Sequence, residues 1–179
     1  MLAIKNKFLT FKVRRGLHGN RYLPKAFSYD ELKKVGVIFT FDDLKKHEAV
    51  KTFIKALKND GIEVKALAYK PKDTQNFEFY FDFFEDSDIT LFGQMNSPYM
   101  LGFLKQNFDY LVCLDDVLNL YMQYMLVNAK ASVRIGAAQE EAHFNNFFEL
   151  MIKPANTTNT AELSNDILTN IRKISGNEQ

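Results

Sequence analysis

Two pairs of adjacent aspartates are the residues in this sequence best suited to chemistry. They are Asp42-Asp43 and Asp115-Asp116, and each pair directly follows a run of hydrophobic residues. Carboxylate oxygens are ligands that Mg²⁺ favours, and Mg²⁺ with a phosphorylated substrate would support phosphoryl transfer by neutralising charge. Aspartate is also one of the best helix N-caps, so capping of a following helix would explain one aspartate of each pair. Capping is the simpler interpretation.

Arg134 is a fifth candidate for ligand binding. Its guanidinium could bind an anion through two parallel hydrogen bonds if it lay beside the carboxylates. It could equally be a strand arginine that pairs with a surface acid, which is the more common situation. We therefore treat Asp42, Asp43, Asp115, Asp116 and Arg134 as candidate ligand-binding residues and assign no catalytic residue.

Motifs for cofactor and metal binding are missing from the sequence. No glycine-rich loop follows the run at 35–41, so neither a P-loop nor a dinucleotide fingerprint is present. His18, His47 and His143 are scattered, without the cysteine or carboxylate spacing of a zinc site. We predict no metal site and no cofactor, except Mg²⁺ if the protein is an enzyme.

The hydrophobic runs before the acid pairs predict the strands that position them. The runs at 35–41 and 109–114 are almost entirely apolar, as in strands that are buried on both faces of a parallel sheet. After the first run, apolar residues at i, i+3, i+4 and i+7 from Val50 predict a helix, and 62–69 predicts a second strand. Strand, helix and strand within about 35 residues form a βαβ unit with a right-handed crossover. Ligands of such sheets bind beyond the carboxyl ends of the strands, where both acid pairs lie.

The rest of the chain continues the same pattern of strands and helices. Aromatic residues alternate over 77–84, which predicts a strand. This strand is a candidate for an antiparallel strand at the edge of the sheet. Further strands are predicted at 131–135 and 146–153, and helices at 117–125 and at 159–174, where Asn159 would be the N-cap. These elements predict a three-layer α/β domain, Rossmann-like or flavodoxin-like, with a mostly parallel sheet.

The first 27 residues are basic and differ from the remainder of the chain. No acidic residue precedes Asp30, and Ile4, Phe8 and Phe11 have the spacing of a short amphipathic helix. One interpretation is an arm that contacts the phosphates of RNA, lipid headgroups or a nucleotide. We expect instead that these aromatic side chains pack on the domain while the lysines face water. The predicted organisation is a basic arm or helix at 1–27 and one α/β domain at 28–179.

Composition narrows the class of protein. The formal net charge of the 179 residues is +1, which argues against nucleic acid as a partner. Cys113 is the only cysteine and lies within a predicted core strand, so we expect a buried thiol. No apolar run approaches the roughly 20 residues of a membrane span, and the predicted location is the cytoplasm.

Three segments carry a resemblance to known families. Residues 87–93 (SDITLFG), 108–115 (FDYLVCLD) and 131–136 (ASVRIG) resemble an uncharacterised protein family of Bacteroidetes-type bacteria, which implies no activity. The last two segments are also similar to the N-terminal half of heptosyltransferase-like glycosyltransferases, which implies a Rossmann-like fold. Those enzymes use two such domains with a cleft between them, and 179 residues have room for one.

Two functional hypotheses remain open at this point. The leading one is a non-catalytic α/β protein that binds a protein partner or a small ligand at the carboxyl ends of its strands. In one form of this hypothesis, copies of the chain associate into a homo-oligomer through their aromatic surface. The alternative is a small Mg²⁺-dependent or nucleotide-using enzyme of the phosphoryl- or glycosyl-transfer type. The alternative requires an aspartate of the first pair to lie close to one of the second.

Overall fold

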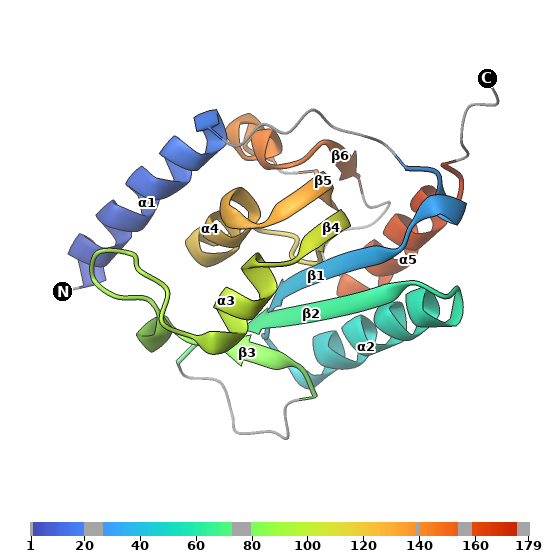
Figure 1. Ribbon diagram of the computed structural model, residues 1–179, viewed down its shortest axis with the longest axis horizontal. Helices are drawn as coiled ribbons and strands as arrows, with labels where there is room; N and C mark the ends of the chain where they lie inside the picture. Colours follow the sequence, from blue (N-terminus) through green and yellow to red (C-terminus); the bar gives the residue numbers. More distant parts are fainter. Residues whose placement is uncertain (1, 20–26, 73–79, 139, 154–158, 175–179) are drawn as a thin grey trace.

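Six strands among the described residues form one sheet at the centre of the molecule (Figure 1). The computed structural model describes residues 2–19, 27–72, 80–138, 140–153 and 159–174. The strand order is β3-β2-β1-β4-β5-β6, and all pairings between these strands are parallel. The strands are β1 (Lys34–Thr40), β2 (Glu63–Tyr69), β3 (Asp82–Phe84), β4 (Asn107–Cys113), β5 (Lys130–Ala137) and β6 (Leu150–Ile152). This is the strand order of dinucleotide-binding Rossmann domains, so the predicted fold class is confirmed.

Helices cover both faces of the sheet and give the three layers. The α-helices are α1 (Leu2–Gly19), α2 (Leu44–Asn59), α3 (Pro98–Leu104), α4 (Leu120–Asn128) and α5 (Thr160–Ile171). Short 3₁₀ helices are η1 (Tyr29–Glu31), η2 (Asp86–Asp88) and η3 (Ala142–Phe147). Helices α2 and α5 pack together on one face, and α3 and α4 cover the other, with α1 lying against α4 (Figure 1). No helix in the described part of the chain is long and apolar enough to cross a membrane.

The apolar character of β1 follows from this burial on two sides. Val35, Val37 and Phe39 point into the core under α2 and α5, whereas Ile38 points into the core under α3 and α4. Gly36 lies on the second side, where an added Cβ would come within 3.0 Å of the side chains of Leu111 and of Phe108. The side chains of Leu111 and Phe108 can therefore pack over β1 at this position because Gly36 has no side chain.

Two predicted strands differ from those observed. β3 pairs in parallel with β2, from Leu67 opposite Asp82 to Tyr69 opposite Phe84, so the possible antiparallel edge was wrong. Alternation of side chains identifies a strand but carries no information on its direction. Only the end of the predicted aromatic strand can be compared, because 73–79 lies outside the described residues. The predicted strand at 146–153 shortens to β6, because η3 continues to Phe147.

The helix predicted in the basic N-terminal segment is present, but its opposite face is buried. Leu9 and Val13 are buried against the core, whereas Ile4, Phe8 and Phe11 are exposed. Lys5 is buried as well, and its ammonium donates a hydrogen bond to the carbonyl oxygen of Asp86. The stem of a lysine can cover apolar surface while its charged end finds a polar partner. The helix packs on the domain as expected, but our expectation that Phe8 and Phe11 form the packed face was wrong.

His47 is an uncommon feature of the core beneath α2. The imidazole is 5% exposed and lies between the rings of Phe41 and Phe81, with centroid distances of 5.7 and 4.9 Å. Its Nδ1 atom is buried and has no hydrogen-bond partner among the described residues. Burial lowers the pKa of His47 below its ordinary value; Glu48 opposes this shift and Lys51 adds to it. The folded protein therefore favours the neutral imidazole.

The burial of His47 predicts that the free energy of unfolding falls at acidic pH. Well above the ordinary histidine pKa of about 6.5, His47 is neutral in both the folded and the unfolded chain, and its burial has no protonation cost. As the pH falls below this value the unfolded chain takes up the proton first, so the free energy of unfolding falls until the folded pKa is passed. Thermal unfolding between pH 7.5 and pH 5 should show this fall in wild type and a smaller one in His47→Leu. A surface control, His143→Gln, should behave like wild type; an equal fall in all three proteins would contradict the assignment.

Candidate functional site

The two acid pairs meet at the carboxyl edge of the sheet, where β1 and β4 lie side by side. From there the chain passes after β1 into α2 on one face, and after β4 towards α4 on the other. A crevice at such a reversal of strand order is the usual ligand site of open α/β sheets. The sequence could not show whether the pairs approach each other, and the structure answers this question.

Asp115 forms the floor of this region through a buried hydrogen-bond network. Its carboxylate accepts hydrogen bonds from the Thr40 backbone amide, at 2.8 and 3.1 Å, and from the Thr40 hydroxyl at 2.5 Å. The Thr40 hydroxyl in turn accepts a hydrogen bond from the Asn119 side chain at 2.6 Å. Asp115 thus links the end of β1 to the loop that leads into α4, and both of its oxygens are already engaged.

Lys46 joins the two acid pairs. Its ammonium lies 2.8 Å from Asp115 Oδ1 and 2.6 Å from Asp42 Oδ2. The side chains of Lys46 and Asp115 are 8% and 3% exposed, whereas that of Asp42 is 57% exposed. Burial alone would lower the pKa of Lys46, but the carboxylates of Asp115 and Asp42 outweigh it and raise the pKa. Lys46 is therefore held as an ammonium ion and is a poor base or nucleophile.

The remaining aspartates have different roles. Asp43 is the N-cap of α2, where its side chain accepts a hydrogen bond from the Lys46 amide at 2.7 Å, so capping is confirmed for the first pair. For the second pair the capping interpretation was wrong: Asn119 caps α4, and its side chain accepts hydrogen bonds from the amides of Tyr121 and Met122. Asp116 is exposed, and its carboxylate accepts a hydrogen bond from the Val117 amide.

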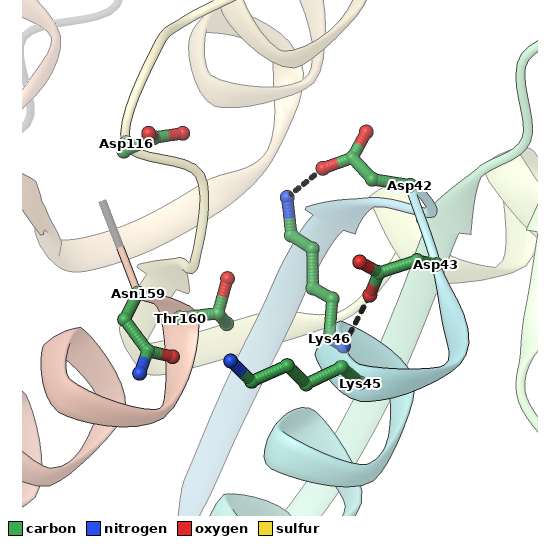
Figure 2. Close-up of a pocket in the computed structure, with 7 residues that line it drawn as sticks. All are labelled: Asp42, Asp43, Lys45, Lys46, Asp116, Asn159 and Thr160. Carbon is green, nitrogen blue, oxygen red and sulfur yellow. Dashed lines mark hydrogen bonds and ion pairs between the residues drawn. The ribbon is translucent and has the colours of Figure 1, made fainter.

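A polar cavity of about 240 Å³ opens above this network (Figure 2). Asp42, Asp43, Lys45 and Lys46 line it from the start of α2, and Asp116 faces it from the loop after β4. The third side is formed by Asn159 and Thr160 at the start of α5, and Figure 2 shows Lys45 extending towards them. The cavity thus offers carboxylate acceptors on one side and an ammonium, an amide and a hydroxyl on the other.

Arg134 lies elsewhere and does not line the cavity. Its guanidinium donates to the carbonyl oxygens of Leu126 at 2.8 Å and Ala129 at 3.4 Å, at the end of α4. It also forms an ion pair with Glu149 at 3.2 Å. These contacts connect β5 to α4 and to the segment before β6. Arg134 is therefore a strand arginine that pairs with an acid, which was the more common of the two alternatives.

The chemistry available to the cavity is hydrogen bonding and charge pairing. Among the described residues no group of three or more His, Cys, Asp or Glu side chains is placed to hold a metal ion. Cys113 is fully buried in β4, and burial, reinforced by the Asp115 carboxylate, raises the pKa of its thiol. The thiol therefore stays protonated and out of reach of a substrate. Lys45, Lys46 and Thr160 are site residues that the sequence did not indicate.

Comparison with known proteins agrees with this architecture. The solved structure of Escherichia coli heptosyltransferase WaaC with ADP is similar to the fold with a TM-score of 0.52 and 8% sequence identity. The match covers 81% of this chain and 49% of that chain, so this chain spans about half of the length of the enzyme. A sequence comparison with curated proteins gave no significant match. The similarity at this identity concerns the fold, as the sequence segments implied.

The relationship at the level of sequence is broader than the three quoted segments. A model of a family of unknown function matches residues 5–170, which includes most of α1, all six strands and most of α5. The match extends over far more than half of the chain. The chain therefore belongs to this family of unknown function, DUF6913.

Proposed function

We propose that this protein binds a small, hydroxyl-bearing anionic metabolite, of the sugar phosphate class, in the cavity between β1 and β4. The observation that carries the proposal is the mixed polarity of the cavity at the reversal of strand order. Asp42 and Asp116 can accept hydrogen bonds from hydroxyl groups, and Lys45 with Thr160 can donate to an anionic group. The setting that we propose with it is the bacterial cytoplasm.

The start of α5 is the more favourable place for the anionic group. At the start of α2 the Asp43 carboxylate already occupies an amide that a phosphate would use, and its charge would repel the phosphate. At α5 the N-cap is the neutral Asn159, whose side chain accepts from the Ala161 amide at 3.0 Å. The partial positive charge of the α5 N-terminus and the Lys45 ammonium would then act together on the ligand.

The size of the cavity favours a small ligand. Sites for drug-sized ligands and cofactors usually have volumes of roughly 300–1,000 Å³. A cavity of about 240 Å³ is better matched to a monosaccharide phosphate than to a dinucleotide. The structural similarity to an enzyme solved with ADP keeps nucleotides in the set of ligands to be tested, although half of that enzyme has no counterpart here.

We propose that the protein binds this ligand without catalysing a reaction. Catalytic acids, bases and nucleophiles generally have pKa values shifted towards their task. Of the groups that line the cavity, Lys46 has a raised pKa, which fixes its proton and removes it as a base. The buried carboxylate of Asp115 is engaged by Thr40 and Lys46, so it contributes to shape rather than to proton transfer.

Thermal unfolding with a ligand panel tests this function. The panel contains hexose phosphates, free hexoses, inorganic phosphate and nucleoside diphosphates, each with and without Mg²⁺. A ligand at 100 times its Kd should add about 2.7 kcal/mol to the free energy of unfolding, which is ~5–10 °C for a chain of this size. We expect this shift for sugar phosphates without Mg²⁺.

Two variants and a matched control locate the effect. Lys45→Ala and Asp116→Asn should lose most of the ligand-induced shift, because each removes one cavity contact without touching the buried network. Lys55→Ala changes an exposed lysine on the same helix and should keep the full shift. A flat panel, or a shift that Lys45→Ala and Asp116→Asn both retain, would contradict the proposed site. A shift that requires Mg²⁺ and leads to product would favour the enzyme hypothesis.

A further inference from the structure

Helix α1 has apolar side chains on two opposite faces. Its inner face, with Leu9 and Val13, packs into the core beside α4. Its outer face carries Ile4, Phe8 and Phe11, whose side chains are 55%, 40% and 63% exposed. A surface helix of a globular protein normally has one apolar stripe, turned towards the core. The second stripe on α1 is therefore not explained by the packing of this domain.

The loop after η2 extends this outer stripe. Phe92 is 64% exposed, and the edge of its ring meets Phe8 with 5.4 Å between the centroids. The carbonyl oxygen of Gly93 accepts hydrogen bonds from the Lys12 ammonium and the Tyr124 hydroxyl, both at 2.7 Å. These bonds fix the loop against α1 and α4. We call Ile4, Phe8, Phe11 and Phe92 the aromatic face.

Basic residues surround the aromatic face. Helix α1 contains Lys5, Lys7, Lys12, Arg14 and Arg15 and no acidic residue. Lys5 donates to the carbonyl oxygen of Asp86 in η2 and Lys12 to that of Gly93 in the loop, and the other three are exposed on the helix. Because the whole chain has a net charge of only +1, this concentration of positive charge is a local feature of α1. An occupant of the aromatic face must therefore tolerate or prefer cations.

We propose that α1 docks the protein on the surface of an anionic lipid bilayer, with the aromatic face among the headgroups. Exposed phenylalanines flanked by lysine and arginine are typical of helices that lie in the plane of a membrane interface. α1 lies at the periphery of the molecule, where a flat surface can reach it (Figure 1). A second copy of the chain would bring the same cations together, and a nucleic acid would leave Ile4 without a partner.

Tryptophan fluorescence provides a direct test, because the chain contains no tryptophan. In full-length Phe11→Trp the single indole reports the environment of the aromatic face. With vesicles of phosphatidylcholine and phosphatidylglycerol in equal parts, we expect a blue shift of its emission and sedimentation of the protein with the vesicles. Vesicles of phosphatidylcholine alone should give a much smaller effect. Raising salt from 0.1 M to 1 M shortens the screening length from about 10 to about 3 Å and should release the protein.

Matched variants separate docking through α1 from non-specific adsorption of the protein to vesicles. Phe11→Ser and Lys7→Glu should each reduce vesicle binding several-fold, and circular dichroism should show an unchanged fold because both positions are exposed. Tyr80→Ser and Lys55→Glu change an exposed aromatic residue and an exposed lysine away from α1, and should bind as wild type does. Equal binding of all variants, absence of any vesicle binding, or binding to single-stranded RNA in its place would overturn the proposal. Vesicle binding does not depend on the cavity, and the thermal unfolding experiments with small ligands contain no vesicles. The two proposals can therefore fail independently.

Discussion

Replacing Asp115 by alanine should lower the free energy of unfolding by about 3–5 kcal/mol. The substitution leaves the Lys46 ammonium in a site where its side chain is 8% exposed, and among the described residues the solvent-exposed Asp42 is then its remaining ion-pair partner. It also removes the acceptor of the Thr40 hydroxyl and amide. Removing one member of a buried ion pair costs far more than the pair itself contributes. Urea unfolding of the variant against wild type measures the difference.

A double substitution separates charge burial from packing. Asp115→Leu combined with Lys46→Met replaces the ion pair by apolar groups of similar size and should recover the part of the loss that comes from the unpaired ammonium. The part that comes from the Thr40 amide and hydroxyl, which still lack their acceptor, should remain. Asp116→Ala is the matched control, because this aspartate is exposed and outside the network, and its effect should stay within about 0.5 kcal/mol. Equal effects of Asp115→Ala and Asp116→Ala would mean that the network does not hold β1 to the α4 loop.

Leu9→Ala should also be strongly destabilising, lowering the free energy of unfolding by about 2–5 kcal/mol. Leu9 is fully buried at the contact of α1 with the core, so truncation leaves a cavity there. Phe11→Ala, on the outer face of the same helix, should change stability by no more than about 0.5 kcal/mol. Chemical unfolding of the two variants tests which face of α1 is inside.

The opposite ranking of the two variants would mean that the aromatic side of α1 is buried, as the sequence suggested. If Phe11→Ala were the more damaging of the two, α1 would pack through its aromatic residues, and the aromatic face would not be available to a bilayer. Unchanged stability of both variants would mean that α1 adds nothing to the domain. Each outcome is distinguishable in the same titration.

The sequence predicted the sheet well because burial on two sides leaves a strong pattern. The runs that became β1 and β4 are apolar at nearly every position, and few other structures require this. The helix α5, its N-cap Asn159 and its stripe from Leu163 to Ile171 were also predicted correctly. The direction of β3 and the buried face of α1 were not, because side-chain periodicity is the same for either choice.

The candidate site was predicted only in part. Both acid pairs were found because they follow strands, but the bond between Asp115 and Thr40 joins residues 75 positions apart. Lys46 gave no signal beyond its spacing of four from Asp42, which precedes the N-cap of α2, and such spacings of opposite charges are common in sequences that form helices. Strand order decides whether such residues meet, and it is not encoded in local periodicity.

Nuclear magnetic resonance of the ¹⁵N-labelled chain during titration with a hexose phosphate tests the central claim most directly. We predict saturable shifts of the backbone amides of Lys45, Asp116 and Thr160, with Arg134 and α1 unaffected. The ³¹P signal should remain that of the unreacted ligand throughout. Absence of saturable shifts at the cavity, or the appearance of a new phosphorus product, would contradict the account of a non-catalytic binding site between β1 and β4.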